Sequence, residues 1–164
     1  MDAIQALKSR RSVRQYSDRP VAGELLEQAV DCARMAATAR NEQPWEFVAV
    51  TSAPKIKELA EITDHGKFLA SAPACVAVFC RETKYFLEDG SAATQNLMVA
   101  AAALGLGSCW IAGDKKPYAQ RIVQALGVPE GFRLVSLVAL GHPAAQPHAP
   151  QKRGLKELLH WEKF

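Results

Sequence analysis

Residues 88–113 (EDGSAATQNLMVAAAALGLGSCWIAG) constrain the fold more than any other part of the chain. Residues 97–104 are all apolar and include four consecutive alanines. A helix that is apolar on all sides is normally buried, and alanine combines high helix propensity with a small side chain. Asp89 or Ser91 is predicted to cap the start of this helix, and Gly105 to end it in a left-handed conformation. The run is far too short to span a bilayer.

Two interpretations of this helix are open. It is either the core helix of one α/β domain, or a core helix shared with a second subunit that leads into a loop beside a cofactor. The segment SCWIAG (108–113) that follows the glycines is predicted to be a short strand.

The length and composition indicate a single domain over residues 1–164. A chain of 164 residues is long enough to bury a core, and 49% hydrophobic with 23% charged residues is typical of a globular protein. A net charge of +3 is too small to argue for nucleic acid. The first residues, MDAIQALKSRR, lack the apolar core of a secretory signal.

The four cysteines show no CxxC spacing. Cys75 and Cys80 are predicted to point to opposite faces of one strand, because side chains alternate along a strand. We therefore expect reduced thiols, mostly in the core, in a cytoplasmic protein.

The apolar pattern predicts a succession of helices and strands. Further helices are expected over residues 2–9, 22–39, 54–63 and 117–127. Strands are expected over residues 45–52, 74–80, 108–113 and 132–141. Together these elements predict a helix-covered sheet of four or five strands.

The C-terminal residues differ from the rest. Residues 144–154 (AAQPHAPQKRG) are polar and contain prolines, whereas residues 155–164 (LKELLHWEKF) carry several large apolar side chains. Such side chains after an extended linker require a surface on which to pack. That surface is either the sheet of this domain or a partner.

Three arginines and a serine lie within residues 10–14 (RRSVR). Guanidinium groups are charge-assisted donors that suit a phosphate. The alternative is a solvated basic helix end, which the helix dipole also favours. An RNA-binding role is less favoured, because Tyr16 is the one aromatic residue close to these arginines in sequence.

Two other segments are candidates for ligand contacts. In ARNEQPW (39–45), the side chains of Asn41 and Gln43 can hydrogen-bond the edge of a polar heterocycle. Trp45 is expected in the core rather than on a ligand. Lys152 and Arg153 are either a second phosphate contact, if the tail folds back, or solvated.

Other chemistries lack their motifs. No phosphate-binding glycine motif opens a helix, no histidine spacing predicts a metal site, and no G-x-S-x-G sequence is present. A basic segment with an apolar interior and few acids or nucleophiles favours an enzyme whose cofactor performs the chemistry.

The chain resembles the FMN-dependent nitroreductase family along almost its whole length. The resemblance rests on four motifs in order, namely RRSVRQY (10–16), NEQPWEF (41–47), GLGSCWIAG (105–113) and the late pair Lys152-Arg153. It implies an α+β sandwich that forms an intertwined homodimer with two FMN sites at the interface. The apolar helix would pack on its counterpart, and residues 144–164 would extend onto the partner subunit.

The resemblance also implies three groups of FMN-binding residues. The phosphate and ribityl end would be held by Arg10, Arg11, Ser12, Arg14 and Arg153. Thr38, Asn41 and Gln43 would reach the flavin from the partner subunit. Backbone groups of Ala112 and Gly113 would lie beside the isoalloxazine ring.

This sequence departs from the family pattern in three places. It lacks the insertion that covers the pocket in longer members. ATAR replaces a serine- and proline-rich lead-in, and HGKF (65–68) lacks an asparagine that some members place on the flavin edge. These departures concern the substrate more than the cofactor.

The function implied by the resemblance is hydride transfer from NADH or NADPH to FMN and then to nitroaromatic, quinone or similar acceptors, in a ping-pong cycle. No catalytic side chain is assigned, and no metal, nucleic acid or membrane is expected. Two alternatives remain: a flavin oxidase or dehydrogenase of a small metabolite, and a non-enzymatic FMN-binding regulatory protein. Cys109 is either a redox bystander or part of the core.

Overall fold

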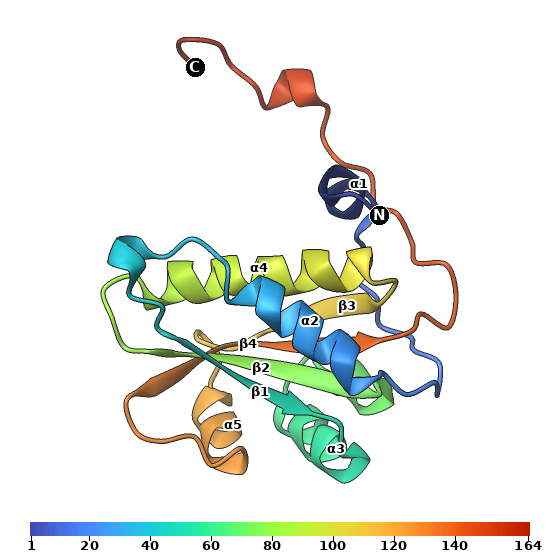
Figure 1. Cartoon of the computed structure of the whole chain (residues 1–164), viewed down its shortest axis with the longest axis vertical. Coiled ribbons are helices and arrows are strands. Elements are labelled where there is room, and N and C mark those ends of the chain that lie inside the picture. Colours follow the sequence, from blue (N-terminus) through green and yellow to red (C-terminus); the bar gives the residue numbers. More distant parts are fainter.

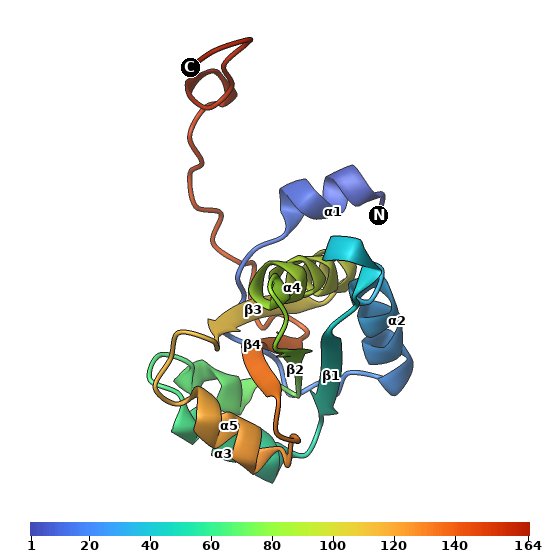
Figure 2. The same ribbon diagram turned by 90° about the vertical axis from the view of Figure 1, so that its left-hand side faces the viewer.

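A computed structural model describes residues 1–164 as an antiparallel sheet covered by helices on both faces (Figures 1 and 2). The strands are β1 (Trp45–Val50), β2 (Ala74–Arg81), β3 (Gly107–Ala112) and β4 (Phe132–Gly141). Their order in the sheet is β1-β2-β4-β3, and every neighbouring pair is antiparallel. The predicted α+β class is confirmed, with four strands.

The helices form two layers around this sheet (Figures 1 and 2). They are α1 (Ala3–Ser9), α2 (Gly23–Ala33), α3 (Ala53–Ile62), α4 (Phe86–Ala103) and α5 (Ala119–Ala125), with single 3-10 turns at Ala39–Asn41, Lys67–Ser71 and Leu155–Glu157. Helices α2 and α4 cover one face, and α3 and α5 cover the other. Helix α1 lies over α4, away from the sheet. No helix is long and apolar enough to cross a membrane.

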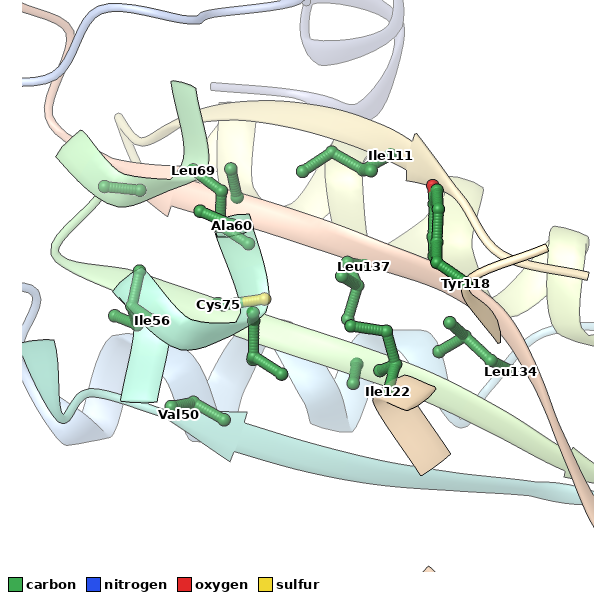
Figure 3. Close-up of a cluster of buried hydrophobic side chains, with 14 of the residues drawn as sticks. Val50, Ile56, Ala60, Leu69, Cys75, Ile111, Tyr118, Ile122, Leu134 and Leu137 are labelled. Carbon is green, nitrogen blue, oxygen red and sulfur yellow. The ribbon is translucent and has the colours of Figure 1, made fainter. Parts of the chain in front are cut away.

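Strand β2 is buried on both faces and divides the interior into two cores. Cys75 packs with α3 and α5, where it lies near Ile56 and Leu137 (Figure 3). Cys80 packs in the other core with α4. The predicted opposite orientation of the two cysteines is therefore confirmed.

Helix α4 approaches the sheet at Gly90. A β-carbon at this position would lie 2.6 Å from Val135 Cγ2 and 2.8 Å from Cys80 Sγ, closer than real β-carbons come. One turn later, Thr94 Oγ1 lies 2.9 Å from Ser136 Oγ on β4 and donates to the Gly90 carbonyl. The helix is thus held against β2 and β4 over its first half.

The predicted end of α4 is confirmed and its predicted start is wrong. Gly105 has φ +78°, the Gly105 N–H donates to the Ala102 carbonyl and the Leu106 N–H to the Ala101 carbonyl. These bonds make a Schellman ending. Neither Asp89 nor Ser91 caps the start, because the helix begins at Phe86 and both residues are inside it.

Helix α2 ends at Ala33, earlier than the predicted 22–39. Residues 34–36 form a turn, and Thr38 is extended with φ −142° and ψ 142°. The physical reason lies outside the segment: the Thr38 side chain bonds to Asp89 on α4, which an uninterrupted helix would prevent.

Several apolar side chains have no cover within the chain. Ile4 and Leu7 on α1 are 64% and 56% exposed, and Trp161 in the tail is 77% exposed. Figures 1 and 2 show the tail extending away from the body. The tail therefore does not pack on the sheet of its own domain, which was one of the two surfaces expected.

We predict that Gly90→Ala destabilises the protein although alanine is the better helix former. Overpacking a core costs about 1–3 kcal/mol, which exceeds the gain of up to about 1 kcal/mol from helix propensity. Urea unfolding measures the change. Gly23→Ala is the control, because its β-carbon would meet nothing within 4 Å and its stability should be unchanged or slightly higher. Equal stability of Gly90→Ala and wild type would contradict the close approach.

Candidate functional site

The arginine segment that follows α1 is fixed to the edge of the sheet. The Val13 N–H donates to the Ser108 carbonyl at 2.9 Å, and Ser12 forms a parallel bridge with Ser108 of β3. The Tyr16 hydroxyl donates to the Val13 carbonyl at 2.6 Å, and burial raises the pKa of this phenol above its usual range. This anchoring holds the neighbouring arginines at the outer edge of β3.

A hollow of about 570 Å³ lies over this segment. Its lining residues are Leu7, Lys8, Arg10, Arg11, Ser12, Arg14, His148, Pro150 and Lys152. Five of them are lysines or arginines and none is acidic, so the hollow attracts anions. The tail contributes His148, Pro150 and Lys152 to it, but not Arg153.

Arg10 and Arg11 have different roles although they are adjacent. The Arg11 Nη1 group donates to the carbonyls of Lys8 (2.7 Å) and Arg10 (2.8 Å), and so satisfies the end of α1. Arg10 Nη1 is buried and has no hydrogen-bond partner. A buried unsatisfied donor on a charged group is costly, so this atom fits an anionic ligand.

Arg14 connects the first hollow with a second. Its guanidinium carbon lies 5.7 Å from the centre of the Phe68 ring. The second hollow, about 190 Å³, is lined by Arg14, Asp64, His65, Phe68, Cys109, Trp110, Ile111, Ala112, Lys116 and Tyr118. Because Arg14 lines both, the two hollows follow the same edge of β3.

An ion pair lies in the wall of the second hollow. Lys116 Nζ is 2.9 Å from Asp64 Oδ2, and this contact lowers the pKa of the Asp64 carboxyl. It connects the loop after α3 with the loop after β3. Cys109 beside it is buried, and burial raises the pKa of its thiol, with Arg14 acting in the opposite direction. Cys109 is thus a core residue.

The backbone groups of Ala112 and Gly113 are engaged within the chain. The Tyr118 hydroxyl donates to the Ala112 carbonyl, and the Gly113 N–H donates to the Val135 carbonyl at 3.1 Å. A β-carbon on Gly113 would lie 2.7 Å from Leu134 Cγ. Packing on β4 therefore explains this glycine without a ligand.

The loop with Thr38, Asn41 and Gln43 lies beside the start of α4, at the opposite end of this helix from the arginine segment (Figure 1). Thr38 contacts Asp89 near the start of α4, whereas Arg10 shares a hollow with Ala102 near its end. At 1.5 Å per residue, these two positions of α4 are about 20 Å apart. One chain therefore does not bring this loop to its own arginine hollow.

Lys152 and Arg153 have different contacts, and Trp45 is buried. Lys152 lines the first hollow, whereas Arg153 does not and instead donates to the carboxylate and carbonyl of Glu157. Trp45 is buried, which confirms its predicted place in the core.

Several residues at the site were not singled out from the sequence. They are Lys8, Asp64, Phe68, Lys116, Tyr118 and His148. The pair of lysines directly after Gly113-Asp114 was the one local signal for Lys116. Lys8 is adjacent to the arginine segment in sequence, whereas Asp64, Phe68 and His148 come from distant segments whose spacing carries no such signal.

Comparison with known proteins places the chain in a family. The Nitroreductase family model matches residues 7–84 and 65–142. A protein of Archaeoglobus fulgidus provisionally named NADH dehydrogenase/NAD(P)H nitroreductase is 34% identical over 99% of both chains.

Two solved structures are also similar. An FMN-dependent nitroreductase from Clostridium difficile R20291 has a TM-score of 0.92 and 28% identity, covering 98% of this chain and 99% of its own. A provisionally named nitroreductase from Desulfovibrio desulfuricans, in complex with FMN, has a TM-score of 0.87 and 30% identity, covering 100% and 98%. Sequence and fold agree, and the chain belongs to the nitroreductase family of oxidoreductases.

Proposed function

We propose that this protein is an FMN-dependent NAD(P)H oxidoreductase whose cofactor lies along the outer edge of β3. The observation that carries the proposal is the buried, unpartnered Nη1 atom of Arg10 in a hollow without acidic residues. Two similar proteins support it, since one is an FMN-dependent nitroreductase and one was solved in complex with FMN.

The residues present fit FMN in two parts. Arg10, Ser12 and Arg14, with Lys152 from the tail, would hold the phosphate and ribityl end in the first hollow. Arg11 would contribute charge, since its Nη1 group serves the end of α1. The second hollow, next to Ala112 and bounded by apolar and aromatic side chains, would hold the ring.

FMN, when bound, would supply the redox chemistry, namely hydride acceptance from NADH or NADPH and electron transfer to nitroaromatic, quinone or similar acceptors in a ping-pong cycle. The chain's own residues bind and orient the cofactor. Lys116 also lines the second hollow, where its charge is paired with that of Asp64 at 2.9 Å. Solvent can supply protons, so no side-chain acid is assigned.

The identity of the electron donor distinguishes this proposal from its alternatives. A flavin oxidase or dehydrogenase of a small metabolite would be reduced by that metabolite, and a regulatory FMN-binding protein would need no turnover. The Archaeoglobus fulgidus relative carries NAD(P)H in its name, which favours the reductase.

We further propose a homodimer in the cytoplasm. The exposed apolar side chains of α1 and of residues 144–164 need a partner surface, and the loop of Thr38, Asn41 and Gln43 would complete the site of the other subunit. The four free cysteines suit a reducing compartment. Neither the small net charge nor the hollows suggest a nucleic-acid partner.

We predict that Arg10→Ala weakens FMN binding by about 1.5–3 kcal/mol, the scale of a hydrogen bond to a charged group. Fluorescence titration of the FMN-free protein measures the affinity. Arg121→Ala on exposed α5 is the control and should bind FMN as wild type does. Unchanged affinity of Arg10→Ala would mean that the arginine segment is only a solvated helix end.

Anaerobic reduction tests the activity directly. NADH or NADPH should bleach the visible flavin band of the FMN-loaded protein, and adding a quinone should restore the colour. If neither nucleotide bleaches the band, the reductase proposal is wrong. If the colourless protein takes up no added FMN, both alternatives fail as well.

Sedimentation velocity tests the dimer. The full chain should sediment at twice the mass of one chain, and Leu158→Ser with Trp161→Ser should shift it toward the monomer by removing exposed apolar area. Lys156→Ser with Lys163→Ser changes two other exposed residues of the same tail and should leave the dimer intact. A folded, FMN-loaded wild-type monomer would contradict the shared site.

A further inference from the structure

The loop between α2 and β1 has an unusual backbone. Arg40, Asn41 and Gln43 have φ angles of +53°, +56° and +45°, although none of them is glycine. L-residues rarely adopt this left-handed conformation. Three such residues within four positions persist only where the surroundings determine the conformation, and such strain occurs often at functional sites.

The carboxylate of Asp89 on α4 is hydrogen-bonded to the start of this loop. Its Oδ2 accepts from Thr38 Oγ1 at 2.8 Å, and its Oδ1 accepts from the Ala39 N–H at 3.2 Å. The Thr38 oxygen in turn accepts from the Gln43 N–H at 3.2 Å. One side chain on a packed helix thereby fixes both ends of the strained loop.

An ion pair does not explain why the carboxylate of Asp89 is buried. The residue is 5% exposed, and none of the ion pairs of the chain includes it. Its charge is felt by Cys80, whose thiol pKa is raised to about 12 by burial and secondly by this carboxylate. A buried charge without a cation is costly, so its loop contacts and its place in the first turns of α4 carry the compensation.

We propose that Asp89 is a positioning residue that holds the loop 38–43 in the one conformation able to reach the FMN of the partner subunit. Thr38 then acts as the connection between Asp89 and Gln43 rather than as a flavin contact, because its hydroxyl is already used in both directions. Asn41 and Gln43 are exposed, and the Gln43 amide is engaged within the loop by one long hydrogen bond of 3.4 Å to the Asn41 carbonyl, so both side chains are accessible to a ligand. This inference rests on the proposed function for the identity of the cofactor.

The test uses variants on both sides of the connection. Asp89→Ala removes the carboxylate, and Thr38→Val removes the hydroxyl at a half-buried position where misfolding is less of a concern. Glu88→Gln is the matched control, since Glu88 is the neighbouring carboxylate of the same helix but is exposed. Thr38→Ser keeps the hydroxyl and should behave more like wild type than Thr38→Val does.

The first measurement needs no cofactor. Arg40 is an exposed trypsin site within the strained loop, and mass spectrometry identifies the peptide cut after it. Release of the loop should speed this cleavage about tenfold in Asp89→Ala and Thr38→Val, the factor that about 1.4 kcal/mol represents. Glu88→Gln should be cleaved at the wild-type rate. Unchanged cleavage in both test variants overturns the proposal.

The second measurement is FMN affinity, accompanied by the visible circular dichroism of the bound flavin. Asp89→Ala and Thr38→Val should bind FMN about tenfold more weakly, about 1.4 kcal/mol, with an altered dichroism spectrum. Faster cleavage with wild-type affinity and spectrum would show a purely structural role and overturn the proposal. A wild-type protein that takes up no FMN would remove the proposed function, while the cleavage rates would still decide whether Asp89 holds the loop.

Discussion

The contact between α4 and the sheet is the one on which the other parts of this structure depend. Gly90 lets the helix approach strands β2 and β4 closely, Ala93, Leu97 and Ala101 pack their apolar side chains in the core between them, and Thr94 is hydrogen-bonded to Ser136 across the contact. Because the interior is packed this closely, the two ends of α4 are held in fixed positions relative to the sheet. The start of α4 then locates the loop 38–43 through Asp89, and its end leads through Gly105 into β3 and the arginine segment.

The elements of this fold were predictable because their signals are local. Strand β4 matches the predicted 132–141 at both ends, and the Gly105 ending of α4 follows from the conformational freedom of a single residue. Errors arose where a distant partner decides. Thr38 lies outside the helix that was predicted to include it and is hydrogen-bonded to a carboxylate 51 positions away, the same carboxylate that the sequence predicts as a helix cap. Alternating helices and strands also leave the strand directions undetermined, and here every pair is antiparallel.

The candidate site shows the same limit more sharply. The basic character of residues 10–14 was evident from composition, but the different contacts of the individual arginines were not. Arg10 and Arg11 are identical in type and adjacent, yet one is left unpartnered in the hollow and the other satisfies the end of α1. Lys152 and Arg153 differ in the same way, since Lys152 lines the hollow whereas Arg153 is hydrogen-bonded to Glu157. Side-chain direction follows from the anchoring of Val13 on Ser108 and from the local path of the tail, which residue type does not encode.

The separation of the two halves of the site along α4 has a consequence for symmetry. Two-fold pairing is the commonest arrangement of homo-oligomers, and it matches one surface patch to itself. The outer side of α4, which α1 covers in part, carries small or apolar residues that are not fully buried, with Val99 and Ala102 half-buried and Ala103 exposed. If α4 packs antiparallel on its twin, the start of each helix lies beside the end of the other. The loop held by Asp89 in one subunit would then face the arginine hollow of its partner, and each pairing would generate two complete sites from parts that one chain keeps about 20 Å apart.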